Sequence, residues 1–561
     1  GNVEGTEYRL GRGVHRGHEL NLKAGDSLIG EDGAVLSGAE LLEGWRFEAP
    51  YWVHDGPHSK LIPYLDDESR VWEQRANYPH DLFYNGVPLI QRMALSRYLL
   101  TGRYWFYDYE SDKVYIGFDP TDLEMELSGL SNYGIKALKG GATLKNLKIE
   151  NYATYNLTPA VDLGPGALVE NCTVSGSHCI GIRISNNSII RRSIFNHNGL
   201  AGLHNGGDGT LIEFSEFGFN GWAGFSGDWA RGGCKVPGVT NTIIRRNYAH
   251  HNTGPGFWFD INATSNLFEE NLSEFNSWEG LIYELSCGCE IRRNILRCNG
   301  LDPRGGLLWG VPFVIQNAED ANIHNNYFES SPDSTSRGGG VGIINQYRPQ
   351  YTDGFCGEHV AEGNSIYDNV IVMPLGGYSG LQYGSFGWET YDDFLKKPNV
   401  WRNNSYYSGK PNSGNFHWYA QGQLPEDFIA KFYNWEEWKS LGQDDDSHFT
   451  GKHSSFFNPN NDEIRQLIID TTGISYEELK APFVDNFLLG DNDEDGDGLP
   501  DSWEKTYGLD TSIDDKDQDL DGDGVSNVDI NEVVNHHDKL KRLLTMTAVR
   551  PPSRFGELFI E

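Results

Sequence analysis

A short phrase ending in asparagine or serine recurs at nearly regular intervals through the middle of the chain. Its copies end at Asn146, Asn171, Ser193, Ser215, Asn247, Asn271, Asn294, Asn326 and Asn369. The steps between them are 25, 22, 22, 32, 24, 23, 32 and 43 residues. A period of about 20–50 residues marks a repeat architecture in which each repeat is one structural unit and longer steps carry loops. The chain is therefore expected to stack coils.

Each copy also shows the periodicity of a β-strand. Hydrophobic and polar residues alternate over four to six positions, and alternation with period two is typical of strands. A second series marks another corner and comprises Asn198, Asn220, Asn252, Asn276 and Asn299. Asparagine at one corner of successive coils can form a hydrogen-bonded ladder, because its amide carries a donor and an acceptor. The sequence therefore predicts an all-β fold, a right-handed parallel β-helix.

The period is lost in places, and this divides the chain into parts. We expect first coils at 1–45, an inserted β-hairpin subdomain at 46–125, the main β-helix with a groove at 126–389, an aromatic and helical C-terminal cap at 390–486, calcium-binding repeats at 487–535 and a tail at 536–561. Helical patterns within the cap fall at 426–441 and 462–470. The cap would cover the strand edge that a solenoid otherwise leaves open.

The charge balance restricts the partners. The chain has 45 basic and 80 acidic residues and a formal net charge of −35, which argues against nucleic acid and anionic membranes as partners. It contains no apolar run of about 18 residues, so no membrane span is expected. The start at Gly1, with no apolar signal core, fits a secreted, periplasmic or cell-surface protein with its signal removed, or a trimmed chain. We expect a monomer.

The cysteines do not predict a zinc site. There are seven of them and no tandem CxxC pairs, so a zinc ribbon is not expected. In an exported protein Cys172 with Cys179, or Cys287 with Cys298, are candidate disulfides. Small buried thiols are the alternative.

Aligning the residue nine positions after each corner fixes the register of one sheet. In the strands that follow, alternation sends Phe257, Phe259, Leu281 and Tyr283 to the core and Trp258, Asp260, Ile282 and Glu284 outward. The same alignment places Asp228, Asp260, Glu284 and Gln316 in one outward column on consecutive coils, about 4.8 Å apart. Stacked like charges destabilise a sheet. The column therefore predicts a bound cation, a shared proton or a substrate, with a solvated acidic face as the alternative.

The neighbouring outward positions favour a sugar. They are Asp162, Arg183, His204, Ser226 and Trp258. Exposed Arg, His and Trp side chains in a row are suited to an anionic or hydroxylated saccharide, with the indole as a stacking surface. An insertion at 229–235 lies beside the column, where loops on a rigid scaffold gather binding residues. The candidate catalytic residues are Asp228, Asp260 and Glu284, and the candidate binding residues are Arg183, His204, Lys235, Trp258, Asn262 and Gln316.

The carboxylate spacing leaves two mechanisms open. Retaining glycosidases hold their carboxyl pair about 5–5.5 Å apart and inverting enzymes about 6.5–9.5 Å apart. Adjacent coils approximate the first range, whereas Asp228 and Glu284, two coils apart at about 9.6 Å, lie at the edge of the second. We expect Asp260 and Glu284 to form the acid/base core with Asp228 assisting. Partial desolvation of Glu284 favours a role as the acid.

Three segments resemble a known group of proteins. Gly-Ala-Val-Leu-Ser-Gly at 33–38, Gly-Pro-Gly-Phe-Trp-Phe-Asp-Ile-Asn at 254–262 and Glu-Gly-Leu-Ile-Tyr-Glu-Leu-Ser at 279–286 resemble secreted bacterial β-helix proteins that act on polysaccharides. The group includes pectate lyases, chondroitinase-B-like lyases, polygalacturonases and β-helical endo-fucanases. The polygalacturonase pattern of paired Asp followed by Gly-His-Gly is absent from the sequence. The resemblance implies a polysaccharide substrate and leaves the reaction open.

Three functions compete. The first is a glycoside hydrolase that cuts within a sulfated marine polysaccharide such as fucan, with Arg183, His204, Arg231 and Lys235 offsetting the net negative charge. The second is a calcium-dependent lyase or C5-epimerase on a uronate polymer, with Lys235 or an arginine abstracting the C5 proton. The third is a non-catalytic carbohydrate-binding adhesin.

A second resemblance concerns calcium. Asp493, Asp495, Asp497, Asp501 and Glu504 match positions 1, 3, 5, 9 and 12 of a calcium loop, with Gly498 at the bend. A second copy comprises Asp519, Asp521, Asp523 and Asn527 and departs at position 12, which is Ile530. The pair is similar to the thrombospondin type 3-like calcium modules of exported bacterial enzymes. The resemblance implies Ca²⁺ as a bound cofactor.

Overall fold

The computed structural model describes residues 4–56, 73–96, 100, 104–129, 133–155, 157–301, 308–331, 338–346, 348, 356, 359–383, 397–410, 414–418, 431–451 and 461–480. The chain divides into two compact units, Gly1–Leu479 and Lys480–Glu561. The predicted calcium repeats at 487–535 and the tail at 536–561 lie outside the described residues.

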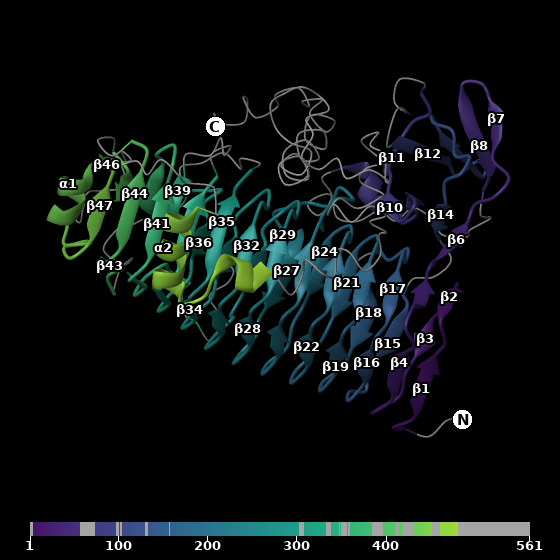
Figure 1. Cartoon of the computed structure of the whole chain (residues 1–561), viewed down its shortest axis with the longest axis horizontal. Helices are drawn as coiled ribbons and strands as arrows, with labels where there is room; N and C mark the ends of the chain where they lie inside the picture. The colour runs from purple at the N-terminus through teal and green to yellow at the C-terminus, as the bar shows by residue number, and fades with distance from the viewer. Residues whose placement is uncertain are drawn as a thin grey trace. The chain divides into compact units, whose positions relative to one another are not determined.

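The first unit is built on three long sheets that run along a parallel β-helix (Figure 1). The first sheet comprises β1 (Glu7–Leu10), β4 (Ser27–Gly30), β16 (Thr143–Lys145), β19 (Leu168–Glu170), β22 (Ile189–Arg191), β25 (Leu211–Glu213), β28 (Ile243–Arg245), β31 (Leu267–Glu269), β34 (Glu290–Arg292), β37 (Asn322–His324), β40 (Ser365–Tyr367) and β43 (Val400–Arg402). The second sheet comprises β2 (Gly13–Arg16), β5 (Ala34–Ser37), β17 (Lys148–Glu150), β20 (Thr173–Ser175), β23 (Ile194–Asn196), β26 (Glu216–Gly218), β29 (Tyr248–His250), β32 (Leu272–Glu274), β35 (Ile295–Asn299), β38 (Tyr327–Ser330), β41 (Val370–Met373), β44 (Ser405–Ser408) and β47 (His448–Thr450).

The third sheet carries the predicted column. It comprises β3 (Leu20–Asn21), β15 (Ile135–Ala137), β18 (Pro159–Leu163), β21 (Ile180–Arg183), β24 (Ala201–His204), β27 (Gly232–Pro237), β30 (Phe257–Asp260), β33 (Leu281–Glu284), β36 (Phe313–Gln316), β39 (Gly338–Asn345), β42 (Tyr378–Tyr383), β45 (Phe416–Trp418) and β46 (Lys431–Tyr433). Its strands pair in parallel from coil to coil, except that β46 pairs antiparallel to β45. The predicted coil architecture is therefore confirmed.

Both asparagine ladders form, as the repeat predicted. In the first, the Nδ2 of Asn271 donates to the Oδ1 of Asn294 at 3.1 Å, and Asn294 donates in the same way to Asn326 at 2.9 Å. The second runs through Asn220, whose Nδ2 donates to the Oδ1 of Asn252 at 2.9 Å. These amides are buried, so the ladders supply the hydrogen bonds that burial requires.

The inward side chains form one long core that includes Phe257, Phe259, Leu281 and Tyr283. All four were predicted to face inward, and their outward neighbours were assigned correctly as well. Alternation along each short strand therefore sets which residues are available for a site.

The insertion forms two sheets with a separate core, and their strands pair antiparallel except for β11 and β12, which pair in parallel. One contains β6 (Ala39–Leu41), β9 (Leu82–Tyr84), β10 (Val87–Pro88) and β14 (Met125–Ser128); the other contains β7 (Arg46–Glu48), β8 (Tyr51–Asp55), β11 (Ile90–Arg92), β12 (Tyr104–Asp108) and β13 (Lys113–Ile116). A 3₁₀ turn, η2, spans Gln74–Asn77. Because β6 pairs with β14, the sheets extend beyond the expected range of 46–125 at both ends. The insertion contacts the β-helix through Asp81, whose Oδ2 lies 3.0 Å from the Nδ1 of His178.

Two helices follow the last coils. Helix α1 (Trp435–Ser440) begins with an Asn434 capping box, and its Trp438 stacks on Phe416 with ring centroids 4.7 Å apart. Helix α2 (Asp462–Thr472) packs beside the second sheet, where the Nε of Arg293 donates to the Thr472 carbonyl at 2.7 Å. Within the described residues, no helix combines the length and apolarity that crossing a membrane requires.

Candidate active site

The outward edge of the third sheet brings two acidic side chains together. Phe259 pairs with Tyr283, which places the next residues, Asp260 and Glu284, side by side on adjacent coils. Glu284 pairs in turn with Gln316. Three of the four residues predicted for the column therefore share it.

The placement of Asp228 in this column is wrong. Pro237, and not Asp228, pairs with Asp260, because the strand of this coil is β27 at Gly232–Pro237. Asp228 lies in an exposed turn before the strand. The preceding Phe225 is buried in a separate apolar cluster outside the coil core.

The error has a physical cause. The phrase at 224–228 imitates the strand pattern, but the extra residues of this coil precede the strand. The following segment, Gly232–Pro237, fits the strand. A Cβ at Gly233 would lie 2.4 Å from the Gly256 carbonyl oxygen, so this position requires glycine. Cys234 and Val236 supply the inward apolar side chains. The outward position assigned to Ser226 is consequently occupied by Lys235, which pairs with His204 and Trp258.

Asp260 is held by a buried cation. The Nζ of Lys235 lies 2.9 Å from the Oδ2 of Asp260, and both side chains are 8% exposed. The other carboxylate oxygen accepts the backbone N–H of Ile261 at 2.8 Å. The Lys235 ammonium also lies 3.5 Å from the Trp258 ring centroid and donates to the Trp229 carbonyl. In such surroundings the ion pair is screened far less than one at the surface.

Glu284 is similarly enclosed. Its side chain is 6% exposed, its Oε2 accepts the indole N–H of Trp258 at 3.0 Å, and its Oε1 lies 3.3 Å from the Nη2 of Arg348. Arg348 donates through Nε at 3.0 Å to the side-chain oxygen of Gln346, which also accepts from Gln316 at 2.9 Å. Arg348 and Gln346 were not anticipated, because nothing in the repeat links them to this coil.

Trp258 does not provide the expected exposed stacking surface. Its ring is 4% exposed and packs in an outer apolar cluster with Ile282, Leu308 and Val314. The indole instead serves as a fixed donor to Glu284.

The outward residues on earlier coils are also paired. Arg183 donates through Nε to the Oδ1 of Asp162 at 2.9 Å and through Nη2 to Oδ2 at 2.5 Å. His204 is buried rather than exposed as expected. Burial lowers its pKa to about 3, and the charges of Lys235 and Arg183 act in the same direction. His204 is therefore a neutral group at ordinary pH.

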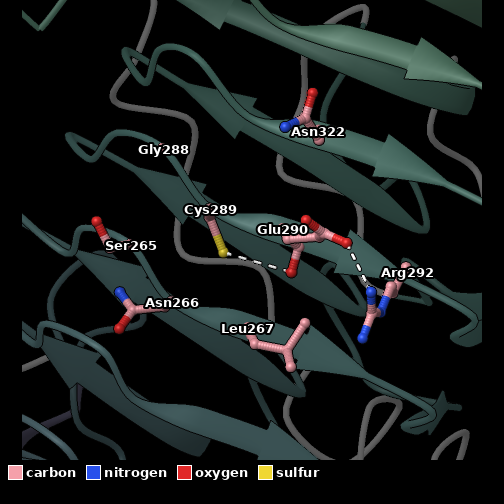
Figure 2. A pocket seen from close by; sticks show the side chains of 8 residues that line it. All are labelled: Ser265, Asn266, Leu267, Gly288, Cys289, Glu290, Arg292 and Asn322. Carbon is pink, nitrogen blue, oxygen red and sulfur yellow. Dashed lines mark hydrogen bonds and ion pairs between the residues drawn. The ribbon is translucent and has the colours of Figure 1, made fainter.

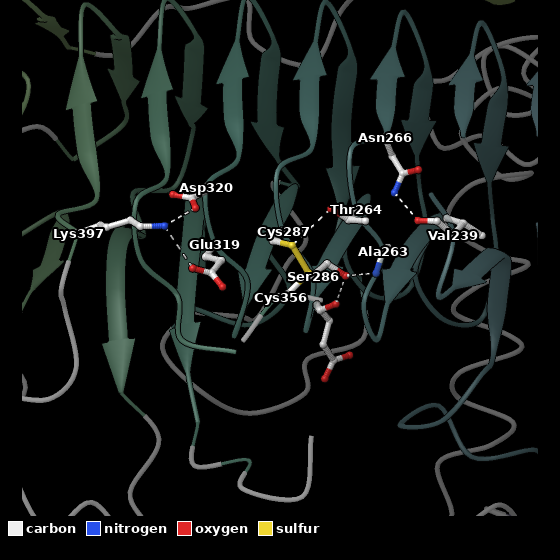
Figure 3. Close-up of a disulfide and its surroundings, with 11 residues drawn as sticks. Val239, Ala263, Thr264, Asn266, Ser286, Cys287, Glu319, Asp320, Cys356 and Lys397 are labelled. Atoms are coloured by element: carbon white, nitrogen blue, oxygen red, sulfur yellow. Dashed lines mark hydrogen bonds and ion pairs between the residues drawn. A yellow bond between two sulfur atoms is a disulfide. The ribbon is translucent and has the colours of Figure 1, made fainter. Parts of the chain in front are cut away.

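A disulfide ties a later part of the chain to this wall. It joins Cys287, which follows β33, to Cys356, with Cα atoms 5.5 Å apart, and Figure 3 shows it beside Thr264 and Ser286. The candidate Cys172–Cys179 and Cys287–Cys298 disulfides are wrong, and Cys172, Cys179 and Cys298 are buried thiols outside any disulfide. Cys172 belongs to the coil core and Cys179 to an outer cluster, so their side chains lie on different faces of the coil wall.

A shallow pocket of about 320 Å³ lies elsewhere (Figure 2). It is lined by Ser265, Asn266, Leu267, Gly288, Cys289, Glu290, Arg292 and Asn322. Arg292 is paired with Glu290 at 2.8 Å, and none of the lining residues belongs to the column. We assign the candidate chemistry to the column, because it combines two enclosed carboxylates, each within 3.3 Å of a cation.

Comparisons with known proteins support the fold. A family model described as a right handed beta helix region matches residues 160–328. A solved structure described as the complex of XylC with xylose is 15% identical, with a TM-score of 0.53, over 72% of this chain and 78% of that chain. No curated protein matches the sequence.

Two further structures are more distant. The A-module of the mannuronan C-5 epimerase AlgE6 from Azotobacter vinelandii is 11% identical, with a TM-score of 0.42, over 72% of this chain and 86% of that chain. A mannuronic acid specific polysaccharide family 6 lyase from human gut microbiota is 11% identical, with a TM-score of 0.42, over 86% and 94%. The chain thus has the right-handed β-helix fold found among carbohydrate-active enzymes, as the sequence resemblance implied.

Proposed function

We propose that this chain is a glycoside hydrolase that acts on a polysaccharide, with Asp260 and Glu284 as its two catalytic carboxyl groups. The observation that carries the proposal is their position on adjacent coils with side chains only 8% and 6% exposed. Adjacent strands lie about 4.8 Å apart, which approaches the carboxyl separation of about 5–5.5 Å in retaining enzymes.

The surroundings suggest different roles for the two groups. Asp260, with Lys235 and the Ile261 N–H holding its charge, is suited to attack the anomeric carbon and form a glycosyl ester. The bond to the leaving oxygen breaks as Glu284 gives that oxygen a proton. Water then attacks the anomeric carbon, Glu284 takes back a proton, and the ester bond to Asp260 breaks.

The acid role of Glu284 requires a rearrangement. Arg348 at 3.3 Å and the Trp258 indole N–H both favour the ionised form of this carboxylate. Glu284 can donate a proton only after the Arg348 contact opens, and a bound sugar would occupy that place. A sugar can reach this partner, because the Arg348 side chain is 28% exposed whereas that of Lys235 is 8% exposed.

The test uses three matched substitutions. Asp260→Asn and Glu284→Gln are each expected to lower kcat by about 10²–10⁴-fold, since each removes a group that reacts or moves a proton. Asp228→Asn is the control, because Asp228 lies exposed and outside the column. Release of new reducing ends is measured on fucan, carrageenan, alginate, pectin and xylan. Retained activity in either column variant would remove that residue from the mechanism.

A slow 2-fluoro glycoside substrate tests the retaining course. Its glycosyl group is expected to remain on Asp260 as an ester that mass spectrometry locates. An adduct-free protein that still turns over the natural polymer would point to an inverting mechanism.

A lyase or C5-epimerase is the second candidate. Lys235 and Arg348 lie beside the column and are cations of the kind that neutralise a uronate carboxylate. A lyase forms an unsaturated product that absorbs in the near ultraviolet, and an epimerase exchanges the C5 hydrogen with solvent. Either signal, lost in Asp260→Asn, would replace the hydrolase proposal; sugar binding with no product at all would leave a binding protein.

The proposal also includes export of the protein from the cell and calcium binding by its C-terminal repeats. The candidate ligands at 493–504 and 519–527 lie outside the described residues, and oxygen ligands at alternate positions with a glycine bend are suited to Ca²⁺. Calorimetric titration with calcium is expected to show binding that Asp497→Ala together with Asp523→Ala abolishes. Unchanged binding in this double variant would contradict the assignment.

A further inference from the structure

A buried histidine on this wall, His359, has ring nitrogens that no described residue satisfies. His359 is 1% exposed, and within the described parts of the chain neither Nδ1 nor Nε2 has a hydrogen-bond partner. Burying a polar group without a partner costs free energy, so such groups in native proteins call for an explanation. A ligand that supplies the missing hydrogen bonds is one such explanation.

The backbone around His359 is fixed by Asn317, the residue after the column member Gln316. The Nδ2 of Asn317 donates to the His359 carbonyl at 3.0 Å, and its Oδ1 accepts the Gln346 N–H at 3.0 Å. Gln346 and His359 therefore meet at one point of the wall. Three residues before His359, Cys356 is bonded to Cys287.

These contacts hold His359 on the same part of the wall as Asp260. Cys287 lies three residues beyond Glu284, so the disulfide holds this stretch at the coil next to that of Asp260. Asp260 is the charged group whose field acts on the His359 ring. Burial nevertheless lowers the pKa of His359 below its ordinary value, so the imidazole is neutral at pH 7.

A second unpartnered atom lies close in sequence. Asn262 follows Asp260 by two residues with a φ of +65°, and its backbone N–H donates to the Leu285 carbonyl at 2.7 Å. Its side-chain Oδ1 is buried and has no partner among the described residues. Asn262 was predicted to bind substrate, and a buried, unsatisfied acceptor fits that role.

The cations around the column are already engaged. Lys235 is paired with Asp260 at 2.9 Å, Arg348 with Glu284 at 3.3 Å, and Arg183 with Asp162 at 2.5 Å. The Arg348 pair opens for any sugar in the proposed mechanism, but a sulfate or carboxylate that takes Lys235 or Arg183 would break that pair and leave Asp260 or Asp162 buried without its cation. That exchange is costly in an enclosed site.

We propose that His359 binds a hydroxyl of the sugar at Asp260, and that this subsite selects a neutral sugar over a uronate or a sulfated one. The inference rests on the proposed function. A neutral imidazole offers one N–H donor and one acceptor nitrogen, and a hydroxyl group both donates and accepts. A carboxylate or sulfate only accepts, so it can pair with the imidazole N–H but leaves the acceptor nitrogen without a hydrogen bond.

The first test compares substrates on the wild-type protein, with Asp260→Asn as the reference for catalysis at this site. Wild-type protein is assayed with aryl glycosides of xylose, arabinose, galactose and fucose, with an aryl glucuronide, and with a sulfated aryl fucoside. We expect kcat/KM to be highest for a neutral glycoside, by at least about tenfold over the anionic ones. A glucuronide or sulfated substrate that is preferred, and whose turnover is lost in Asp260→Asn, overturns the inference while the hydrolase proposal stands. Turnover unaffected by Asp260→Asn on every substrate overturns the hydrolase proposal itself.

The second test examines the hydrogen bond. His359→Leu is expected to lower kcat/KM on the preferred glycoside by about 10- to 100-fold, with His359→Gln retaining more activity because its amide donates and accepts. His417→Leu is the control, since His417 is also buried but lies on β45, several coils away.

Deoxy analogues of the preferred glycoside then identify the bonded hydroxyl. For one deoxy position, removal of the hydroxyl and His359→Leu should not have additive effects, because both remove the same bond. A loss that is equal for the parent and for every deoxy analogue assigns His359 a structural role only. An unchanged kcat/KM in His359→Leu overturns the proposal, as does an equal loss in His417→Leu.

Discussion

The ion pair between Lys235 and Asp260 gives the sharpest stability prediction. Replacing Lys235 with methionine keeps an unbranched side chain over the Trp258 ring but removes the cation 2.9 Å from Asp260. Because both side chains are 8% exposed, the carboxylate that remains is buried with one backbone donor, the Ile261 N–H. Breaking a buried pair in this way costs about 3–5 kcal/mol.

The matched control is an exposed pair on the same β-helix. Lys397 pairs with Asp320, and these side chains are 49% and 44% exposed. Solvent screening limits such a pair to about 0–1 kcal/mol. Urea unfolding followed by tryptophan fluorescence at pH 7 gives the free energy of unfolding of Lys235→Met and Lys397→Met for direct comparison.

A double-mutant cycle separates the pair from the packing. Asp260→Asn removes the charge that Lys235→Met leaves behind, so the double variant should be more stable than the sum of the single losses implies, by about 2 kcal/mol or more. Either of two results would refute the claim that the buried Lys235–Asp260 ion pair stabilises the fold. One is that the effects of the two substitutions on the free energy of unfolding are additive. The other is that Lys235→Met lowers this free energy no more than Lys397→Met does.

Three further predictions concern the scaffold. Asn294→Ala removes the acceptor of the buried Asn271 N–H at 2.9 Å and the donor to Asn326, so it should lower the free energy of unfolding by about 2–4 kcal/mol. The control, Asn322→Ala at an exposed position, should lower it by less than about 0.5 kcal/mol. Equal urea midpoints for the two variants would contradict a stabilising role of the ladder. The double variant Cys287→Ser/Cys356→Ser removes a cross-link between residues 69 positions apart, so its free energy of unfolding should be lower by about 4 kcal/mol through chain entropy. Reductant should destabilise the wild-type protein and leave this variant unchanged. A wild-type stability that reductant does not alter would contradict the prediction. Burial lowers the pKa of His80 and of His204 to about 3. Below about pH 6.5 the unfolded chain therefore binds more protons than the folded protein. The free energy of unfolding should fall by about 1.4 kcal/mol per pH unit for each histidine as the pH drops from 6.5 toward 3. His80→Gln should therefore flatten this fall in urea titrations, and an unchanged slope would exclude His80 as its source.

The sequence was sufficient to predict the coil wall, because the spacing of the asparagine corners and the alternation of residues within each strand lead to the same register. The asparagine corners repeat once per coil, and between them strict alternation decides that Phe259 points inward and Asp260 outward. Asp228 was misplaced because the corner spacing gives the length of a coil but not where its extra residues lie. Two glycine-led segments competed for one strand, and only packing against the neighbouring coils distinguishes Cys234 from Phe225 as the inward residue.

The other half of the site has no local signal. Arg348 and His359 reach the column because Asn317 and the Cys287–Cys356 bond hold their part of the chain against it. A pattern confined to one coil cannot report such contacts. Exposure was misjudged for the same reason: Trp258 and His204 are outward by alternation, yet later segments and Lys235 cover them.

The carboxylates of the column are balanced by neighbouring groups of the same chain. A stack of bare carboxylates would demand an outside cation, but Pro237 replaces Asp228, Lys235 balances Asp260, and Arg348 balances Glu284. The two partners differ in a way that matters for catalysis. Lys235 is buried to the same extent as Asp260, whereas Arg348 is 28% exposed and comes from a different part of the chain. A permanent partner suits a group that must remain an anion, and a displaceable partner suits a group that must gain and lose a proton. This asymmetry, more than the spacing, is why we assign the nucleophile to Asp260 and the acid to Glu284.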